Sequence, residues 1–215
     1  MAPVIPDPRT IRAFPDAAAF ERWLSSNHDG DGVLWLKVHK KGSGLPSVTY
    51  AEALEVALCW GWIDGQRKSF DEHSFLQRFT PRTRTSRWSQ INCAHVERLI
   101  AAGRMRPQGL REIDAAKADG RWQRAYAPIR SATVPEDLAA AIAKNAKARA
   151  TFETLNNQNR FALGFRVGSL KTATARSKRI AEYVAMLARG ETLLPNGARK
   201  KTVAKKAKKK ARRAS

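Results

Sequence analysis

The chain has 215 residues, which is enough for one ordinary domain or two small ones, and its hydrophobic content of 43% can form a core. Its formal net charge of +21 favours nucleic acid, anionic membranes or acidic small molecules as partners. Two cysteines are too few for a disulfide framework, no run is apolar enough for a membrane span, and residues 1–10 lack the pattern of a signal peptide. We therefore expect a reduced, intracellular protein of the cytoplasm.

The chain is expected to begin with an extended arm, a helix and a strand. Residues 1–13 carry three prolines and are expected to form the arm. Asp16 can cap a short helix, because its side chain can accept a hydrogen bond from the first helical turn. Residues 33–38, VLWLKV, are β-branched and aromatic, which predicts a strand.

A second helix and then two strands are predicted next. Thr49 and Glu52 have the spacing of a capping box, in which each side chain accepts from the other residue's backbone N–H, so a helix is expected to begin there. Asp64 and Gly65 predict a tight turn. Residues 74–79, SFLQRF, predict another strand. Helices and strands that follow one another in this way indicate an α+β domain.

The rest of the folded chain has a helical pattern. Helix starts are predicted at Ser89, Pro107 and Pro135, because serine is a good N-cap and proline suits the first helical turn. Apolar residues at helical spacing in residues 180–187 predict the last helix.

The predicted fold class is α+β, with two folded parts between an arm and a tail. The expected ranges are 1–13 for the extended arm, 14–126 for a small α+β domain with a short sheet, 127–194 for a mainly helical C-terminal domain, and 195–215 for a disordered basic tail. Residues 199–215 hold ten lysines and arginines and no acid, which leaves +11 of the formal charge on the preceding residues. Such a segment cannot bury enough apolar surface to fold alone.

The tail predicts non-specific binding to nucleic acid. Its cations would contact phosphates, and since it has no aromatic side chain, base stacking is not expected. The residues assigned to this contact are Lys200, Lys201, Lys205, Lys206, Lys208, Lys209, Lys210, Arg212 and Arg213. A solubilising tail without a specific partner is the alternative. Association with the nucleoid is a further expectation.

Tryptophan, arginine and serine gather between residues 60 and 105. Arginine suits bidentate recognition of carboxylate or phosphate, and free N–H groups at a helix start favour an anion. The candidate ligand-binding residues are Trp62, Asp64, Arg82, Ser86, Trp88, Ser89, Asn92 and Arg104. They predict a site for an anionic small molecule or a protein partner. Alternatively, the tryptophans are core, the serines are caps and the arginines are solvated.

Patterns for catalysis and metal binding are weak. Asp64 could act as a general base or a metal ligand, but an aspartate at a turn more often serves the backbone. The four histidines are scattered, so no metal site is predicted. The chain has no nucleophile elbow, P-loop or dinucleotide-binding fingerprint. No catalytic residue and no cofactor is assigned, and whether the chain is an enzyme stays open.

Several short motifs together resemble one protein family. They are ALCWGWIDG (residues 57–65), FTPR (79–82), SRWSQIN (86–92), GRMRPQG (103–109), DGRW (119–122), VPEDLAAAI (134–142) and ARSKRIAEYVAML (175–187). This combination is similar to the YdeI/OmpD-associated proteins, described as bacteriocin-protection proteins, over nearly all of residues 14–190. The resemblance implies a bacterial protein linked to tolerance of bacteriocins or cationic antimicrobial peptides. It implies no reaction, so no catalytic residue is carried over.

The sequence leaves three functions open. The first is a non-enzymatic stress-tolerance protein whose body binds an anionic ligand or partner while its tail binds nucleic acid. The second is an enzyme acting on a phosphorylated or carboxylated small molecule at the cluster of tryptophan, arginine and serine. The third is a chromosome-associated DNA-binding protein.

Overall fold

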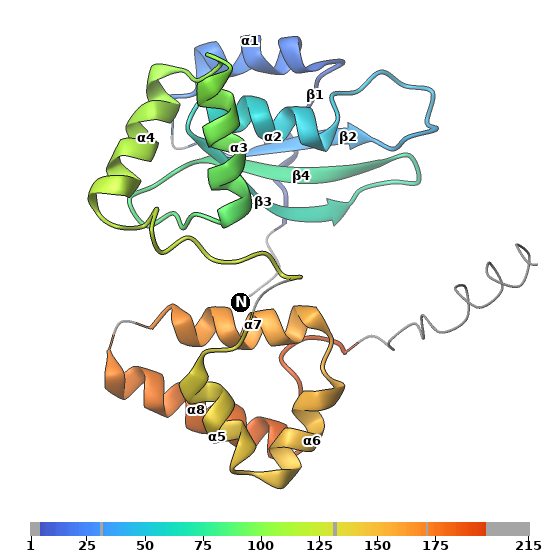
Figure 1. Cartoon of the computed structure of the whole chain (residues 1–215). Helices are drawn as coiled ribbons and strands as arrows, with labels where there is room; N and C mark the ends of the chain where they lie inside the picture. The colour runs from blue at the N-terminus through green and yellow to red at the C-terminus, as the bar shows by residue number, and fades with distance from the viewer. Residues whose placement is uncertain (1–4, 31, 131–132, 171, 197–215) are drawn as a thin grey trace, which may run out of the picture. The chain divides into compact units, whose positions relative to one another are not determined.

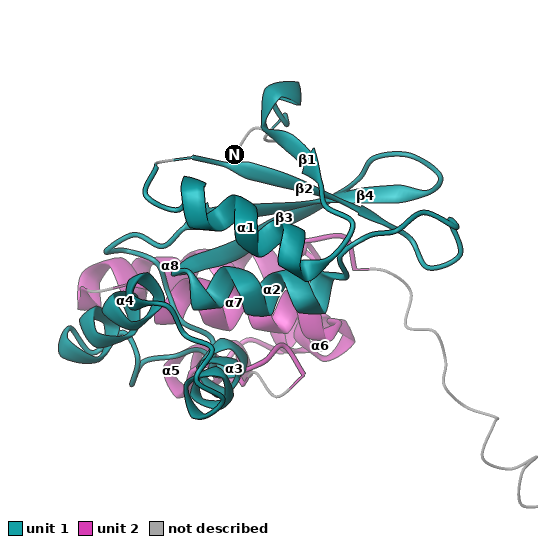
Figure 2. Ribbon diagram, turned by 90° about the horizontal axis from the view of Figure 1, so that it is seen from above, with its two compact units in different colours: residues 1–127 teal, residues 128–215 magenta. Residues whose placement is uncertain are grey.

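A computed structural model describes residues 5–30, 32–130, 133–170 and 172–196. The chain divides into two compact units, residues 1–127 and 128–215, which Figure 2 shows in teal and magenta. From residue 197 on, the predicted tail and all of its cations lie outside the described residues.

The first unit is built on a four-stranded sheet with the strand order β1-β2-β4-β3. The strands are β1 (Ile11–Ala13), β2 (Leu34–His39), β3 (Trp62–Ser69) and β4 (Ser74–Pro81). Strand β1 is parallel to β2, and the pairs β2–β4 and β3–β4 are antiparallel. The two strands predicted from residues 33–38 and 74–79 are therefore confirmed as β2 and β4. Residues 11–13, expected to belong to an extended arm, form one edge strand of the sheet, β1.

Four helices complete this unit: α1 (Ala17–Asn27), α2 (Tyr50–Cys59), α3 (Gln90–Ala101) and α4 (Pro107–Ala118). The predicted caps are present, because Asp16 accepts from Ala19 N, and Thr49 and Glu52 form the reciprocal capping box. Helix α2 is apolar on nearly every side and contacts α1, α3, α4 and β3. It is therefore the central helix of the unit, as Figure 1 shows.

The tight turn predicted at Asp64 and Gly65 is wrong. Strand β3 runs through both residues, and its pairing with β4 shifts register between Asp64 and Arg67. The side-chain amide of Gln77 on β4 donates to the carbonyl oxygens of Gly65 and Gln66 at this irregularity, at 3.0 and 3.4 Å. A β-bulge, which uses the same small and polar residues as a turn, explains the error.

The described part of the second unit is helical, as predicted. It contains α5 (Glu136–Ala143), α6 (Ala146–Thr154), α7 (Asn157–Gly168) and α8 (Ala173–Ala188) around a core that includes Leu138, Leu163 and Leu187. Arg176 on α8 joins three helices. It donates to both carboxylate oxygens of Asp137 on α5, at 2.5 and 2.9 Å, and to the carbonyl oxygen of Val167 on α7 at 3.1 Å.

Candidate functional site

The centre of the candidate site is Arg82, the first residue after β4. Its backbone N–H donates to the carbonyl oxygen of Gly61 at 2.9 Å, which continues the pairing of β4 with β3 and points the side chain inward. The residue is only 6% exposed. A strand end thus carries a formal charge into the interior of the first unit, where charged groups are rare unless they are paired.

The guanidinium group of Arg82 has two contacts and two unused donor atoms. It lies over the indole of Trp88, with its central carbon 3.5 Å from the ring centroid. Its Nη1 donates to the carbonyl oxygen of Arg87 at 3.2 Å. Its Nε and Nη2 are buried and meet no hydrogen-bond acceptor in the part of the chain that the structure describes. Burial lowers the pKa of Arg82 to about 10, although the carboxylates of Glu112 and Asp64 act to raise it.

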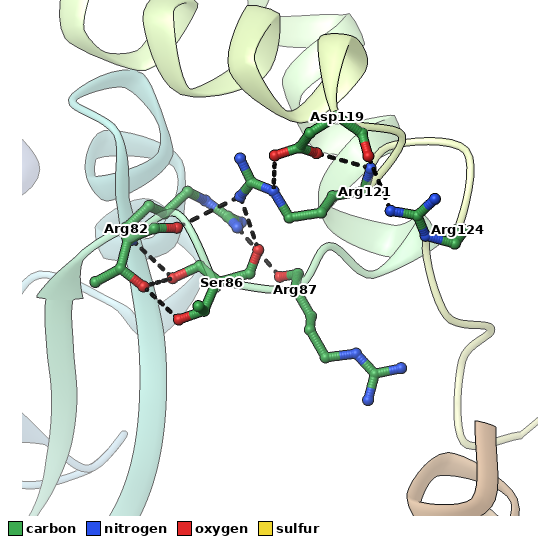
Figure 3. Close-up of polar contacts among 8 residues, drawn as sticks. Arg82, Ser86, Arg87, Asp119, Arg121 and Arg124 are labelled. Atoms are coloured by element: carbon green, nitrogen blue, oxygen red, sulfur yellow. Dashed lines mark hydrogen bonds and ion pairs between the residues drawn. The ribbon is translucent and has the colours of Figure 1, made fainter. Parts of the chain in front are cut away.

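A second arginine holds the loop that leads from β4 to α3. Arg121 donates from Nη1 to the carbonyl oxygens of Ser86, at 3.0 Å, and Thr83, at 3.4 Å, while its Nε donates to Asp119 at 2.7 Å. Arg124 binds the carbonyl oxygen of Asp119 at 2.9 Å. Figure 3 shows the guanidinium groups of Arg82, at the start of this loop, and of Arg121, after α4, both reaching the loop. Arg121 was not among the predicted site residues, although the DGRW motif contains it.

The two predicted serines contact the backbone. The Oγ of Ser86 accepts from the N–H of Thr83 at 2.8 Å, which closes the loop after Arg82. Ser89 caps α3, since its Oγ accepts from the N–H of Asn92 at 3.1 Å. The N–H of Gln90 donates to the carbonyl oxygen of Tyr126. These contacts use N–H groups of the first turn that an anion would need, so the guanidinium of Arg82 offers the better anion contact.

Two further predicted ligand-binding residues, Trp62 and Arg104, make contacts with other parts of the first unit. Trp62 is 1% exposed, donates from Nε1 to the carbonyl oxygen of His28 at 3.3 Å, and lines a hollow of about 360 Å³ together with Trp23 and Asp29. Arg104 is paired with Glu55 on α2, at 2.6 Å between Nη1 and Oε2. Both contacts link elements of the fold, which makes them structural.

Asp64 is joined to a residue that the sequence did not single out. Its Oδ2 accepts from the hydroxyl of Tyr50 at 2.8 Å. Burial, and then the negative charge of Asp64, raise the pKa of Tyr50 well above its usual value. Tyr50 therefore stays a hydrogen-bond donor to Asp64 across the physiological range.

Metal and thiol chemistry gain no support from the described residues. No group of three or more histidine, cysteine, aspartate or glutamate side chains there could hold a metal ion. Cys59 and Cys93 are buried, and burial raises the pKa of the Cys59 thiol to about 11. A thiol with such a pKa is a poor nucleophile at neutral pH. None of the described helices is long and apolar enough to cross a membrane.

Comparison with known proteins gives two matches, one in each unit. Residues 12–112 match a domain of unknown function (DUF8412), a range that includes Arg82, Trp88 and Asn92. Residues 131–190 match the family described as bacteriocin-protection, YdeI or OmpD-associated. No curated protein and no solved structure matches the chain. The predicted resemblance to the YdeI/OmpD-associated, bacteriocin-protection family is therefore confirmed for residues 131–190, whereas residues 12–112 of the expected range match the domain of unknown function.

Proposed function

We propose that this protein is a non-enzymatic stress-tolerance protein whose first unit binds an anionic ligand through Arg82. The observation that supports the proposal is the buried guanidinium with two N–H groups that meet no acceptor among the described residues. Burying a charged group whose N–H donors have no acceptor is costly, and a bound anion would offset that cost. The site would thus bind an anion more strongly than an exposed arginine could.

The surroundings of Arg82 favour binding over catalysis. Trp88 supports one face of the guanidinium, and the carbonyl oxygen of Arg87 fixes one edge, so the group is held in a single orientation. The carboxylates of Glu112 and Asp64 act on it by charge, and its Nε and Nη2 have no hydrogen-bond partner among the described residues. Because Nε and Nη2 are buried, an anion would enter through a local opening of the loop between β4 and α3, which would release the contacts of Arg121 with Thr83 and Ser86.

The test is a titration of the full-length, ¹⁵N-labelled protein with sodium acetate, sodium nitrate and sodium sulfate, with sodium chloride as the balancing salt. At least one of these anions is expected to shift the Arg82 Nε–H signal in a saturable way. Arg82→Lys keeps the charge but lacks the planar pair of donors, so saturable binding should be lost. Arg84→Lys makes the same chemical change at an exposed position of the same loop and should bind like the wild type.

Two results would overturn the proposal. One is that none of the three anions binds to the wild-type protein. The other is that a folded Arg82→Lys variant binds as well as Arg84→Lys. The physiological part is tested separately, by survival of a deletion strain exposed to a bacteriocin or a cationic antimicrobial peptide. Survival equal to that of the wild type would remove the stress-tolerance function.

The basic tail is the second part of the proposal. We assign non-specific nucleic-acid binding to residues 199–215, because their ten cations can neutralise phosphates without reading bases. This assignment rests on the sequence alone. It is independent of the Arg82 site, so either part can fail without the other.

A further inference from the structure

We infer that the anion bound by Arg82 is a small monocarboxylate and not a phosphate, an inference that rests on the proposed anion-binding function. The two unused N–H donors of Arg82 indicate the shape of the ligand, and the nearby carboxylates limit how much negative charge the ligand can carry. Both features can be read from the described contacts.

The two unused donors lie on one edge of the guanidinium. Nε–H and Nη2–H point in the same direction, whereas Nη1, on the other edge, donates to Arg87. A carboxylate offers two oxygens in one plane, which match this edge with two parallel hydrogen bonds. The vacant edge therefore fits a planar oxyanion, and the Trp88 ring that covers one face of the guanidinium favours a flat partner.

Two carboxylates near Arg82 limit the charge of the ligand. Gly61 accepts from the backbone of Arg82, and a Cβ on Gly61 would lie 3.2 Å from Cγ of Glu112, so Glu112 is close to the strand end that holds Arg82. In the β3–β4 ladder, Trp62 pairs with Pro81, the residue before Arg82. Asp64, two residues further along β3, pairs with Phe79, so it also lies near the end of β4. The buried guanidinium thus has two acids in its vicinity, and neither accepts a hydrogen bond from its Nε or Nη2.

A ligand with one negative charge can neutralise Arg82 with little repulsion from these acids. A dianion such as sulfate, or phosphate above neutral pH, would bring a second charge toward Glu112 and Asp64. At the reduced effective dielectric of a protein interior, that repulsion costs enough to weaken binding about tenfold or more. The ligand is also expected to be small, because the Nε and Nη2 atoms of Arg82 are buried and only a small group can reach them.

The discriminating experiment compares dissociation constants for acetate, nitrate, sulfate and inorganic phosphate at pH 7.5, measured from the Arg82 Nε–H signal of the full-length protein. Acetate is expected to bind at least about tenfold more tightly than sulfate or phosphate. Nitrate, which is planar and singly charged, should compete with acetate. Glu112→Gln removes one nearby negative charge and should raise the relative affinity for sulfate several-fold.

The outcomes separate this inference from the function on which it rests. If sulfate or phosphate binds as tightly as acetate, the monocarboxylate inference is wrong while anion binding at Arg82 stands. If Glu112→Gln leaves the ratio of affinities unchanged, the charge argument is wrong. If none of the anions binds, both fail. The comparison uses the wild-type protein and Glu112→Gln, so it remains decisive where substitution of Arg82 prevents folding.

Discussion

The guanidinium of Arg82 stacks on the indole of Trp88 with 3.5 Å between its central carbon and the ring centroid. Trp88 packs in turn against Trp122, with 4.9 Å between ring centroids. The end of β4, the loop before α3 and the segment after α4 therefore meet at one indole. A residue in this position supports the anion site and the packing of the first unit together.

Replacing Trp88 with alanine should destabilise the first unit strongly. The side chain is 2% exposed, so its removal leaves a cavity and exposes the Arg82 guanidinium, and losses of about 3–5 kcal/mol are typical of such substitutions. The measurement is urea unfolding followed by circular dichroism. The control is Ile91→Ala on α3, whose side chain is 48% exposed and should change the free energy of unfolding by less than about 0.5 kcal/mol. Similar effects of the two variants would contradict a supporting role for Trp88.

The parts of this site that could be predicted are those encoded locally. The N-cap at Ser89 and the capping box at Thr49 follow from a few adjacent residues, and both are present. The gathering of tryptophan and arginine around residues 60–92 drew attention to Arg82 and Trp88, whose side chains are in contact. Such signals depend on short-range hydrogen bonds that a sequence displays directly.

The parts that could not be predicted depend on tertiary contacts. The bulge at Asp64 and Gly65 exists because β4 pairs with β3 and supplies Gln77 to bind the exposed carbonyl groups. Arg121 reaches the loop after Arg82 across more than thirty residues of sequence, a relationship that no local pattern encodes. Propensity and motif spacing carry no information about which distant segment will supply such a partner.

Gly109 should be intolerant of any side chain. A Cβ at this position would overlap the carbonyl oxygen of Cys59 and lie 2.7 Å from Cε of Met105, because α4 approaches the end of α2 at this point. Gly109→Ala should therefore lower the free energy of unfolding by about 1–3 kcal/mol or more, as overpacked substitutions do. Thermal unfolding of the full-length protein measures the effect.

The matched control for this glycine is Gly168, at the end of α7. It is exposed, and a Cβ there would meet nothing within 4 Å. Gly168→Ala should leave stability unchanged or raise it by about 0.4–1 kcal/mol, because alanine reduces the entropy of the unfolded chain. If both variants were equally stable, the close approach of α4 to α2 would not be a constraint in solution.

The pairing of Asp137 with Arg176 should make the free energy of unfolding of the second unit depend on pH in the acidic range. The hydrogen bonds from Arg176 hold the pKa of Asp137 below its ordinary value of 3.8. A lowered pKa in the folded state means that the contribution is present above pH 3.8 and is lost as the pH falls through the folded-state pKa. Asp137→Asn cannot titrate, so its loss of stability between pH 6 and pH 3 should be smaller than that of the wild type.

The measurement for this pair is thermal unfolding at a series of pH values in low salt. Glu191→Gln is a suitable control, because Glu191 forms an exposed pair with its near neighbour Arg189 and joins no separate helices. Its acid dependence should resemble that of the wild type more closely than that of Asp137→Asn. Identical pH profiles for the wild type and Asp137→Asn would show that this pair does not stabilise the unit.

Removal of residues 199–215 should weaken binding to duplex DNA and change its dependence on salt. If all ten cations contact phosphates, the slope of log K against log salt concentration is about −9 for the tail alone, so deletion should make the observed slope less negative by up to that amount. Fluorescence anisotropy with two unrelated duplexes measures both quantities, and affinities for the two should agree because no base is read.

A variant carrying a glycine and serine segment of equal length in place of the tail controls for chain length. The body keeps a formal charge of +11, so any slope that survives the deletion reports its own contact with phosphate. An unchanged affinity and slope would mean that the body, and not the tail, carries whatever nucleic-acid binding the protein has.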